Sequence, residues 1–334
     1  MKFYHYILFV FSFTVLFACK GQKTVSEQTE TIDSSRICAV KFSGDSAYQF
    51  VKNQCDFGPR VPNSTAIQKC GDYIAKQFED YGLEVTNQRT TVTGWDKKQL
   101  ACRNIIASYK PEMAGRVIIC SHYDSRPWAD ADPDEANHHT PVMAANDGAS
   151  GVAVMLEIAR LINDINPKVG VDFICFDAED YGVPDWAPDD LQADQNSWCL
   201  GSQYWAENPH KAGYVARYGI LLDMVGGRGS TFSYEGFSLK YAQSIVIRTW
   251  EAARFADAAD YFPQTNGGYI TDDHVPMNEI ARIPTIDIIP FFTSGDNTFG
   301  PTWHTINDTV ENIDPDVLRA VGQTLVQLLS EENE

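Results

Sequence analysis

A short acidic segment after an apolar run is the first candidate for chemistry in this sequence. Residues 171–176 are mostly apolar, and Asp177, Glu179 and Asp180 follow them, before a glycine turn at Gly182. Neighbouring carboxylates repel one another and lose hydration when they approach a core, so a chain seldom places them there without a compensating cation. The segment is therefore a candidate metal site, although a polar loop after a strand would explain it equally well if it stood alone.

Further side chains that can bind a metal follow other apolar runs, and one lies at the start of a predicted helix. These are His122 and Asp124 after residues 117–120, Asp223 after 219–222, His304 after 285–289, and Asp147 at the helix start. In open α/β sheets, ligands bind beyond the carboxyl ends of the strands, where these groups would converge. Each has a simpler explanation when taken alone, such as a helix cap or a structural histidine. Together they favour a metal centre, and mixed carboxylate and imidazole ligands suit zinc better than magnesium or calcium.

Other chemistries lack their motifs. The sequence contains no GxSxG segment for a serine hydrolase and no GxxxxGK[ST] phosphate loop. The glycine-rich turn Gly226-Gly-Arg-Gly229 follows an acidic residue and does not open a clear helix. The formal net charge of −19, with no basic run, argues against a nucleic-acid partner.

The elements that must position these side chains alternate along the chain. Apolar patterning predicts strands over residues 84–92, 102–108, 117–120, 171–176, 219–222 and 285–289. It predicts helices over residues 45–54, 68–81, 152–162, 201–207, 239–255 and 316–329, with long loops over 125–146 and 183–197. The sequence therefore predicts a single α/β domain over residues 37–334, with a doubly wound, mostly parallel mixed sheet flanked by helices.

The first 36 residues are expected to direct export and membrane attachment, and not to form part of the folded domain. Residues 1–19 have the layout of a secretory signal, and their end, Leu16-Phe-Ala-Cys19, resembles the lipobox of bacterial lipoproteins. Residues 20–36 are polar, without aromatic side chains, and are typical of a flexible tether. We therefore expect an exported lipoprotein anchored to the membrane through Cys19, most simply facing the periplasm; an ordinary signal peptide is the alternative.

The remaining cysteines show no zinc-knuckle spacing, and nothing in the sequence specifies a disulfide. Cys120 and Cys175 lie in apolar runs and are most simply buried thiols.

Five blocks of the sequence, in this order, resemble the signature of the zinc aminopeptidase and glutaminyl cyclase family. They are His122-x-Asp124, Asn146-Asp-Gly148, Asp177-Ala-Glu-Asp180, Leu222-Asp-Met224 and Trp303-His304. Within that family, the lipoprotein-like start and two further blocks look most like the glutaminyl cyclases of Bacteroidetes-type bacteria. These blocks are Ser197-Trp-Cys-Leu-Gly-Ser-Gln203 and Thr271-Asp-Asp-His-Val-Pro276.

This resemblance implies a zinc-dependent glutaminyl-peptide cyclotransferase, which converts the N-terminal glutamine of peptides and proteins to pyroglutamate and releases ammonia. It implies one zinc per chain and a monomer. The resemblance also implies a role for eight residues of this chain. Zinc would be bound by Asp147, Asp180 and His304, catalysis would be carried out by Glu179, Asp223 and Asp272, and the substrate would contact Trp198 and Trp303.

Two other functions remain open at this stage. In a two-zinc aminopeptidase of the same family, His122 and Asp223 would hold a second metal bridged by Asp147, and Glu179 would activate a bound water. The aspartate at position 180 and the 272–276 block favour the cyclase. A non-catalytic, receptor-like domain would be signalled by a lost ligand or a lost Glu179, and none is lost. The disulfide of the animal cyclases has no counterpart, since Cys120 finds no cysteine at 151–156.

Overall fold

The computed structural model describes residues 33–192, 195–295 and 297–332. The predicted signal segment, Cys19 and nearly all of the predicted tether lie outside the described residues. The last tether residues are described, and Ser34–Arg36 form the 3-10 helix η1. Arg36 there forms ion pairs with Glu251 and Glu331. Within the described part of the chain, no helix is both long and apolar enough to cross a membrane.

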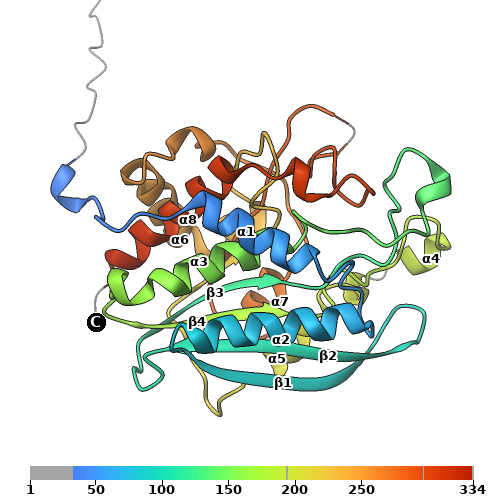
Figure 1. Cartoon of the computed structure of the whole chain (residues 1–334), viewed down its shortest axis with the longest axis horizontal. Helices are drawn as coiled ribbons and strands as arrows, with labels where there is room; N and C mark the ends of the chain where they lie inside the picture. The colour runs from blue at the N-terminus through green and yellow to red at the C-terminus, as the bar shows by residue number, and fades with distance from the viewer. Residues whose placement is uncertain (1–32, 193–194, 296, 333–334) are drawn as a thin grey trace, which may run out of the picture. The chain divides into compact units, whose positions relative to one another are not determined.

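A six-stranded mixed sheet lies at the centre of the fold, in the order β1-β2-β4-β3-β5-β6. Figure 1 labels the strands β1, β2, β4 and β3 of this sheet. The strands are β1 (Glu84–Thr93), β2 (Gln99–Tyr109), β3 (Arg116–His122), β4 (Gly170–Phe176), β5 (Gly219–Leu222) and β6 (Thr285–Ile288). The four strands β4, β3, β5 and β6 are parallel to one another, and the β1–β2 hairpin joins them antiparallel through β2 and β4. Every residue of β3 and β4 is buried, as expected for parallel strands covered on both faces.

Helices cover both faces of this sheet. They are α1 (Gly44–Cys55), α2 (Thr65–Asp80), α3 (Ala149–Ile165), α4 (Asp189–Gln192), α5 (Leu200–Glu207), α6 (Gly236–Phe255), α7 (His274–Glu279) and α8 (Pro315–Ser330). One face packs against α2, α3 and α6, and α1 and α8 pack in turn against α3, all within one large apolar cluster. The other face packs against α5 and α7 through a smaller cluster that includes Trp205 and Met277.

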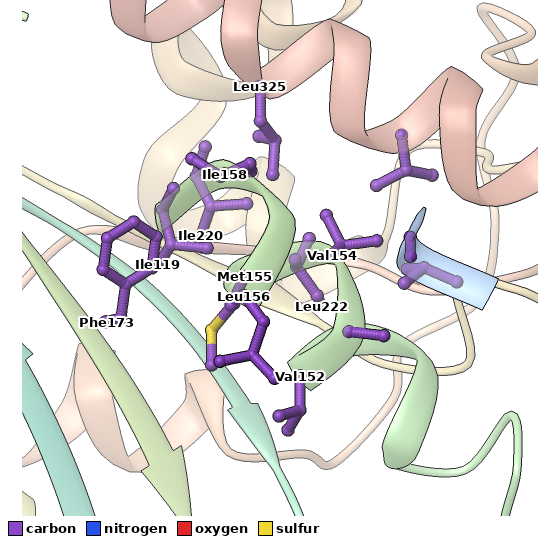
Figure 2. Close-up of a cluster of buried hydrophobic side chains, with 14 of the residues drawn as sticks. Ile119, Val152, Val154, Met155, Leu156, Ile158, Phe173, Ile220, Leu222 and Leu325 are labelled. Atoms are coloured by element: carbon purple, nitrogen blue, oxygen red, sulfur yellow. The ribbon is translucent and has the colours of Figure 1, made fainter. Parts of the chain in front are cut away.

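Helix α3 is the central helix of the larger layer. Figure 2 shows Val152, Val154, Met155, Leu156 and Ile158 of α3 among side chains from three strands and from α8, namely Ile119, Phe173, Ile220, Leu222 and Leu325. Burial of this apolar area favours folding by about 25 cal/mol per Å² removed from water. Because α3 is held from both sides, its first turn has a fixed position at the carboxyl edge of the sheet.

The connections reverse direction beside β3. From β3 the chain passes through α3 to β4 on one side, and from β4 it returns to β5 on the other. The carboxyl ends of β3 and β5 therefore lie at the switch point, where open α/β sheets bind their ligands. The predicted fold class, and the six strands and six helices predicted from the sequence, are confirmed.

The sequence did not predict α7 or the short helix α4. The sequence predicts no regular element for the segment around Asp272, which contains Pro276. Proline is compatible with the first turn of a helix, since the N–H that it lacks would have no intrahelical partner there. Pro276 occupies such a position in α7.

Candidate metal centre and active site

The acidic segment after β4 is held by the aspartate that follows β3. The backbone N–H groups of Glu179 and Asp180 donate to Asp124 Oδ1 and Oδ2, each at 3.1 Å. Asp124 Oδ1 also lies 3.4 Å from His122 Nδ1. Asp124 is thus a positioning residue for three groups. The third acid of the segment, Asp177, does not join them: it accepts the Arg103 N–H at 2.8 Å, away from the candidate metal ligands.

Asp147 is fixed just before the first turn of α3. Asp308 accepts the backbone N–H groups of Asn146 and Asp147, at 2.7 and 3.1 Å. The following residue must be glycine, because a Cβ on Gly148 would lie 2.5 Å from His122 O and 2.6 Å from His122 Nε2. The Asn-Asp-Gly block therefore lets α3 begin directly against the end of β3.

The three predicted zinc ligands come together. Ligand atoms of Asp147, Asp180 and His304 all lie within 4.8 Å of one another, and all three residues are buried. His304 Nε2 lies 3.3 Å from Asp180 Oδ1 and 3.7 Å from Asp147 Oδ2. Asp180 Oδ2 is buried without a hydrogen-bond partner, and burial raises the pKa of this carboxyl. Two carboxylates and one imidazole with an unsatisfied buried oxygen fit a zinc ion with an open position.

A buried arginine–aspartate pair supports this group, and the sequence did not reveal it. Arg126 donates from Nε to Asp130 Oδ1 at 2.6 Å and from Nη2 to Asp130 Oδ2, and its Nη1 lies 3.3 Å from Asp180 Oδ1. Asp130 Oδ1 also lies 3.4 Å from His304 Nδ1. The pair therefore contacts two of the three ligands from behind, as orienting partners of metal ligands commonly do.

A second group of possible ligands shares Asp147. His122 Nε2 lies 2.9 Å from Asp147 Oδ1 and 3.2 Å from Asp223 Oδ1. All three residues are buried, and their ligand atoms lie within 4.8 Å of one another. Burial lowers the pKa of His122, but hydrogen bonds to the surrounding carboxylates outweigh it and raise the pKa well above its usual value. The structure thus contains the ligands of the two-metal arrangement as well.

Glu179 lies with two other acid–base groups. Its Oε1 is 3.4 Å from the thiol of Cys199, and ligand atoms of Glu179, Cys199 and Asp272 lie within 4.8 Å of one another. Burial raises the pKa of Glu179 well above its usual value. Burial, followed by the charge of Asp223, does the same for Asp272. A carboxyl with a raised pKa can both accept and donate a proton near neutral pH.

All eight predicted site residues line one cavity of about 550 Å³. The two tryptophans flank the metal group: the Trp303 ring stacks on His304 at 3.8 Å between centroids, and the Trp198 ring lies 6.1 Å from it. The sequence did not identify the more apolar part of the wall. Its residues include Tyr269, Ile270, Ile289, Phe291 and Phe299. Ile289 directly follows β6. The other side chains lie in loops without periodicity, which carry no signal of their orientation.

Comparison with known proteins agrees with this fold. The sequence model of peptidase family M28 matches residues 104–329, so the chain belongs to this family.

Among solved structures, a glutaminyl cyclase of Bacteroides thetaiotaomicron bound to N-acetylhistamine has 51% identity and a TM-score of 0.85, covering 88% of this chain and 99% of that one. A leucine aminopeptidase precursor of the same species has 50% identity and a TM-score of 0.85, covering 89% of this chain and 100% of that one.

Curated relatives are more distant. The glutaminyl-peptide cyclotransferase of Drosophila melanogaster is 23% identical, over 77% of this chain and 72% of the relative. The first two curated relatives are matched over only 33% and 57% of their own lengths. The second of these, aminopeptidase YwaD of Bacillus subtilis, is 26% identical over 86% of this chain.

Proposed function

We propose that this protein is a zinc-dependent glutaminyl-peptide cyclotransferase with one zinc per chain. The observation that carries the proposal is the shared cavity: a three-ligand metal group, a buried carboxyl and an acidic pair all line the same 550 Å³ space. The similarity to glutaminyl cyclases over nearly the whole of their chains supports the same function.

Asp147, Asp180 and His304 would hold the zinc, which when bound would act as a Lewis acid toward the side-chain carbonyl of the N-terminal glutamine. Glu179 takes a proton from the α-ammonium group, so that the free amine can attack, and later returns a proton to the departing ammonia. Nucleophile and electrophile belong to one molecule, so no covalent bond to the enzyme is required.

The remaining residues hold the substrate. Asp223 and Asp272 lie where they can accept hydrogen bonds from the substrate amine, and both have raised pKa values; that of Asp223 is about 6, through burial and then the charge of Asp147. Such a pair can share a proton. Trp198 and Trp303 wall the cavity and exclude water, which would otherwise compete with the amine for the carbonyl.

A two-zinc aminopeptidase is the second candidate function, because the His122, Asp147 and Asp223 group could hold another metal. Some similar solved structures also carry peptidase names. A paired assay on the full chain, purified in mild detergent, separates the two functions. One substrate is a glutamine-initiated peptide followed for ammonia release. The other is a leucine-initiated peptide followed for free leucine, with metal content measured on the same sample.

Ammonia without leucine, at about one zinc per chain, is the expected result. Free leucine at about two zincs per chain would establish the aminopeptidase instead. If neither substrate gives product at full metal content, both enzymatic functions are rejected, and a receptor-like domain is the remaining interpretation.

We also propose that the protein is an exported monomer, attached to a membrane by a lipid on Cys19 and facing the periplasm. Cell fractionation tests the anchor. Wild-type protein should sediment with membranes, and the Cys19→Ala variant should not carry the lipid. Equal lipid labelling of the two proteins would refute it.

A further inference from the structure

A small pocket adjoins the main cavity and has no role in the proposed reaction. This side pocket has a volume of about 150 Å³, and its lining includes Asn146, Gly227, Arg228, Ser230, Phe299 and Asn312. Two features connect it to the active site. Phe299 lines both spaces, and Asn146 directly precedes the metal-ligand candidate Asp147.

The two spaces differ in charge. Five carboxylates line the main cavity, those of Asp147, Glu179, Asp180, Asp223 and Asp272. The described lining of the side pocket contains no carboxylate, and Arg228 is its one charged side chain. In a chain of net charge −19, a cationic pocket beside the catalytic carboxylates is a local exception. Its charge favours an anionic group.

The glycine-rich turn after β5 builds this pocket. Gly227 must lack a side chain, because a Cβ there would lie 2.8 Å from Asn146 Nδ2 and 3.2 Å from Ser230 Oγ. The Arg228 N–H donates to Asn312 O at 3.0 Å, which fixes the turn. The sequence motif Gly226-Gly-Arg-Gly229 thus places Arg228 beside two polar side chains.

Those polar side chains are buried donors. Ser230 is 2% exposed, and its Oγ has no hydrogen-bond partner. Asn146 is 5% exposed and uses its Oδ1 to accept the Gly226 N–H at 2.9 Å, which leaves Nδ2 as the donor end of the amide. The Arg228 guanidinium donates to a backbone carbonyl, Glu311 O, at 3.4 Å. Among the described residues, no carboxylate forms an ion pair with it.

We propose that the side pocket binds a carboxylate of the peptide substrate, downstream of its N-terminal residue. A carboxylate would accept from Arg228, from the Ser230 hydroxyl and from the Asn146 amide, and it would satisfy the buried hydroxyl that is unpartnered here. The small volume suits one head group rather than a peptide segment. The inference rests on the proposed cyclotransferase function, because it places the N-terminal glutamine in the main cavity.

The carboxylate can come from an acidic side chain or from the C-terminus of a short peptide, and matched peptides distinguish these sources. One pair is Gln-Glu-Ala-amide and Gln-Gln-Ala-amide, and a second is Gln-Ala-Glu-amide and Gln-Ala-Gln-amide. The third pair is Gln-Ala-Ala with a free and with an amidated C-terminus. Each pair is measured with the wild type, with Arg228→Gln, with Ser230→Ala and with Arg282→Gln. The last variant removes one exposed positive charge outside both pockets and controls for net charge.

In at least one pair, the acidic member is expected to have about a tenfold higher kcat/KM, the effect of one charge-assisted hydrogen-bonded contact. The gain should come through KM. It should disappear in Arg228→Gln, decrease in Ser230→Ala and persist in Arg282→Gln, while the neutral peptides turn over equally well in all proteins.

Equal kcat/KM within all three pairs would overturn the inference, as would a preference that survives Arg228→Gln. If no peptide releases ammonia, the proposed function has failed by itself. Calorimetric binding of the same peptide pairs to wild type and Arg228→Gln then decides the side pocket separately: tighter binding of an acidic member, lost in the variant, supports it, and equal binding rejects it.

Discussion

Two buried arginine–aspartate pairs allow a matched test of the metal centre. Asp130→Asn removes the carboxylate that Arg126 and His304 share. The side chains of Arg126 and Asp130 are each 1% exposed, so this change leaves a buried guanidinium whose remaining ion pair among the described residues is with Asp180. Breaking such a pair costs about 3–5 kcal/mol of the free energy of unfolding. Arg126 would also compete more strongly with the metal for Asp180, while His304 would lose its orienting acceptor. Zinc affinity should therefore fall about 10- to 100-fold.

Asp172→Asn is the control, because it breaks a pair of the same kind outside the cavity. Asp172 is 0% exposed and accepts from Arg116 Nε and Nη2, both at 2.6 Å. Its loss of stability should be of similar size, about 3–5 kcal/mol, with zinc affinity unchanged. Stability is measured by urea unfolding. Zinc affinity is measured by competition with a chromogenic chelator at pH 7, in buffer without denaturant. Equal zinc affinity in the two variants would refute the role given to Asp130, because general destabilisation would then explain its whole effect.

Three further outcomes are expected. Glu179→Gln should retain zinc and lose about 10²- to 10⁴-fold in kcat, the usual contribution of a general acid–base group; a fully active variant would remove that assignment. Cys199→Ala should lower kcat about two- to tenfold without changing KM, since the thiol lies 3.4 Å from Glu179 Oε1. Cys199→Ser should restore kcat, because a hydroxyl can also donate to Glu179. If kcat does not recover in Cys199→Ser, Cys199 contributes only packing. Burial, followed by the charge of Asp124, raises the pKa of Asp177 to about 8, so the folded state binds a proton that the unfolded state has released. Stability should therefore fall by up to about 1.4 kcal/mol per pH unit between about pH 5 and 7. Other buried carboxyls with raised pKa values, such as Asp223, add slopes of the same sign. Asp177→Asn should therefore lower the slope of stability against pH by this one contribution, and the exposed control Asp260→Asn should leave it unchanged, as measured by urea unfolding across that range; parallel slopes in all three proteins would contradict the assignment.

The sequence predicted the sheet, and it predicted that the candidate ligands would lie together, because both depend on short-range patterns. Apolar runs identify the parallel strands, and an acid directly after a run, such as Asp223 after β5, lies at the carboxyl edge. His304 reaches that edge only through the long loop after β6. Gly148 illustrates how closely a motif can correspond to geometry, since any side chain there would collide with His122. The assignment of Asp177 to the same acidic set was the exception. In that segment, the backbone turn, rather than the spacing of the acids, decides which carboxyl faces the cavity.

The supporting residues could not be predicted in this way. Arg126 and Asp130 lie in a long loop without periodicity, so nothing in the sequence shows that they pair with each other or contact Asp180 and His304. Cys199 lies in the 197–203 block, but nothing in the sequence shows that its thiol contacts Glu179. These contacts depend on side-chain directions that only the assembled fold defines, and the same is true of the aromatic wall formed by Phe291 and Phe299.

The spacing of the ligands along the chain has a consequence for how the protein resists unfolding. Asp147, Asp180 and His304 come from three separate connections, and α5, β5, α6, α7 and β6 all lie between the last two. A bound ion would act as a cross-link that closes two loops, one of them long, and long loops gain most from closure. All seven described cysteines are free, so the described part of the chain contains no covalent cross-link. An ion that binds only the native state shifts the unfolding equilibrium by mass action. The availability of metal would therefore control how long the folded chain resists proteolysis, as well as its activity.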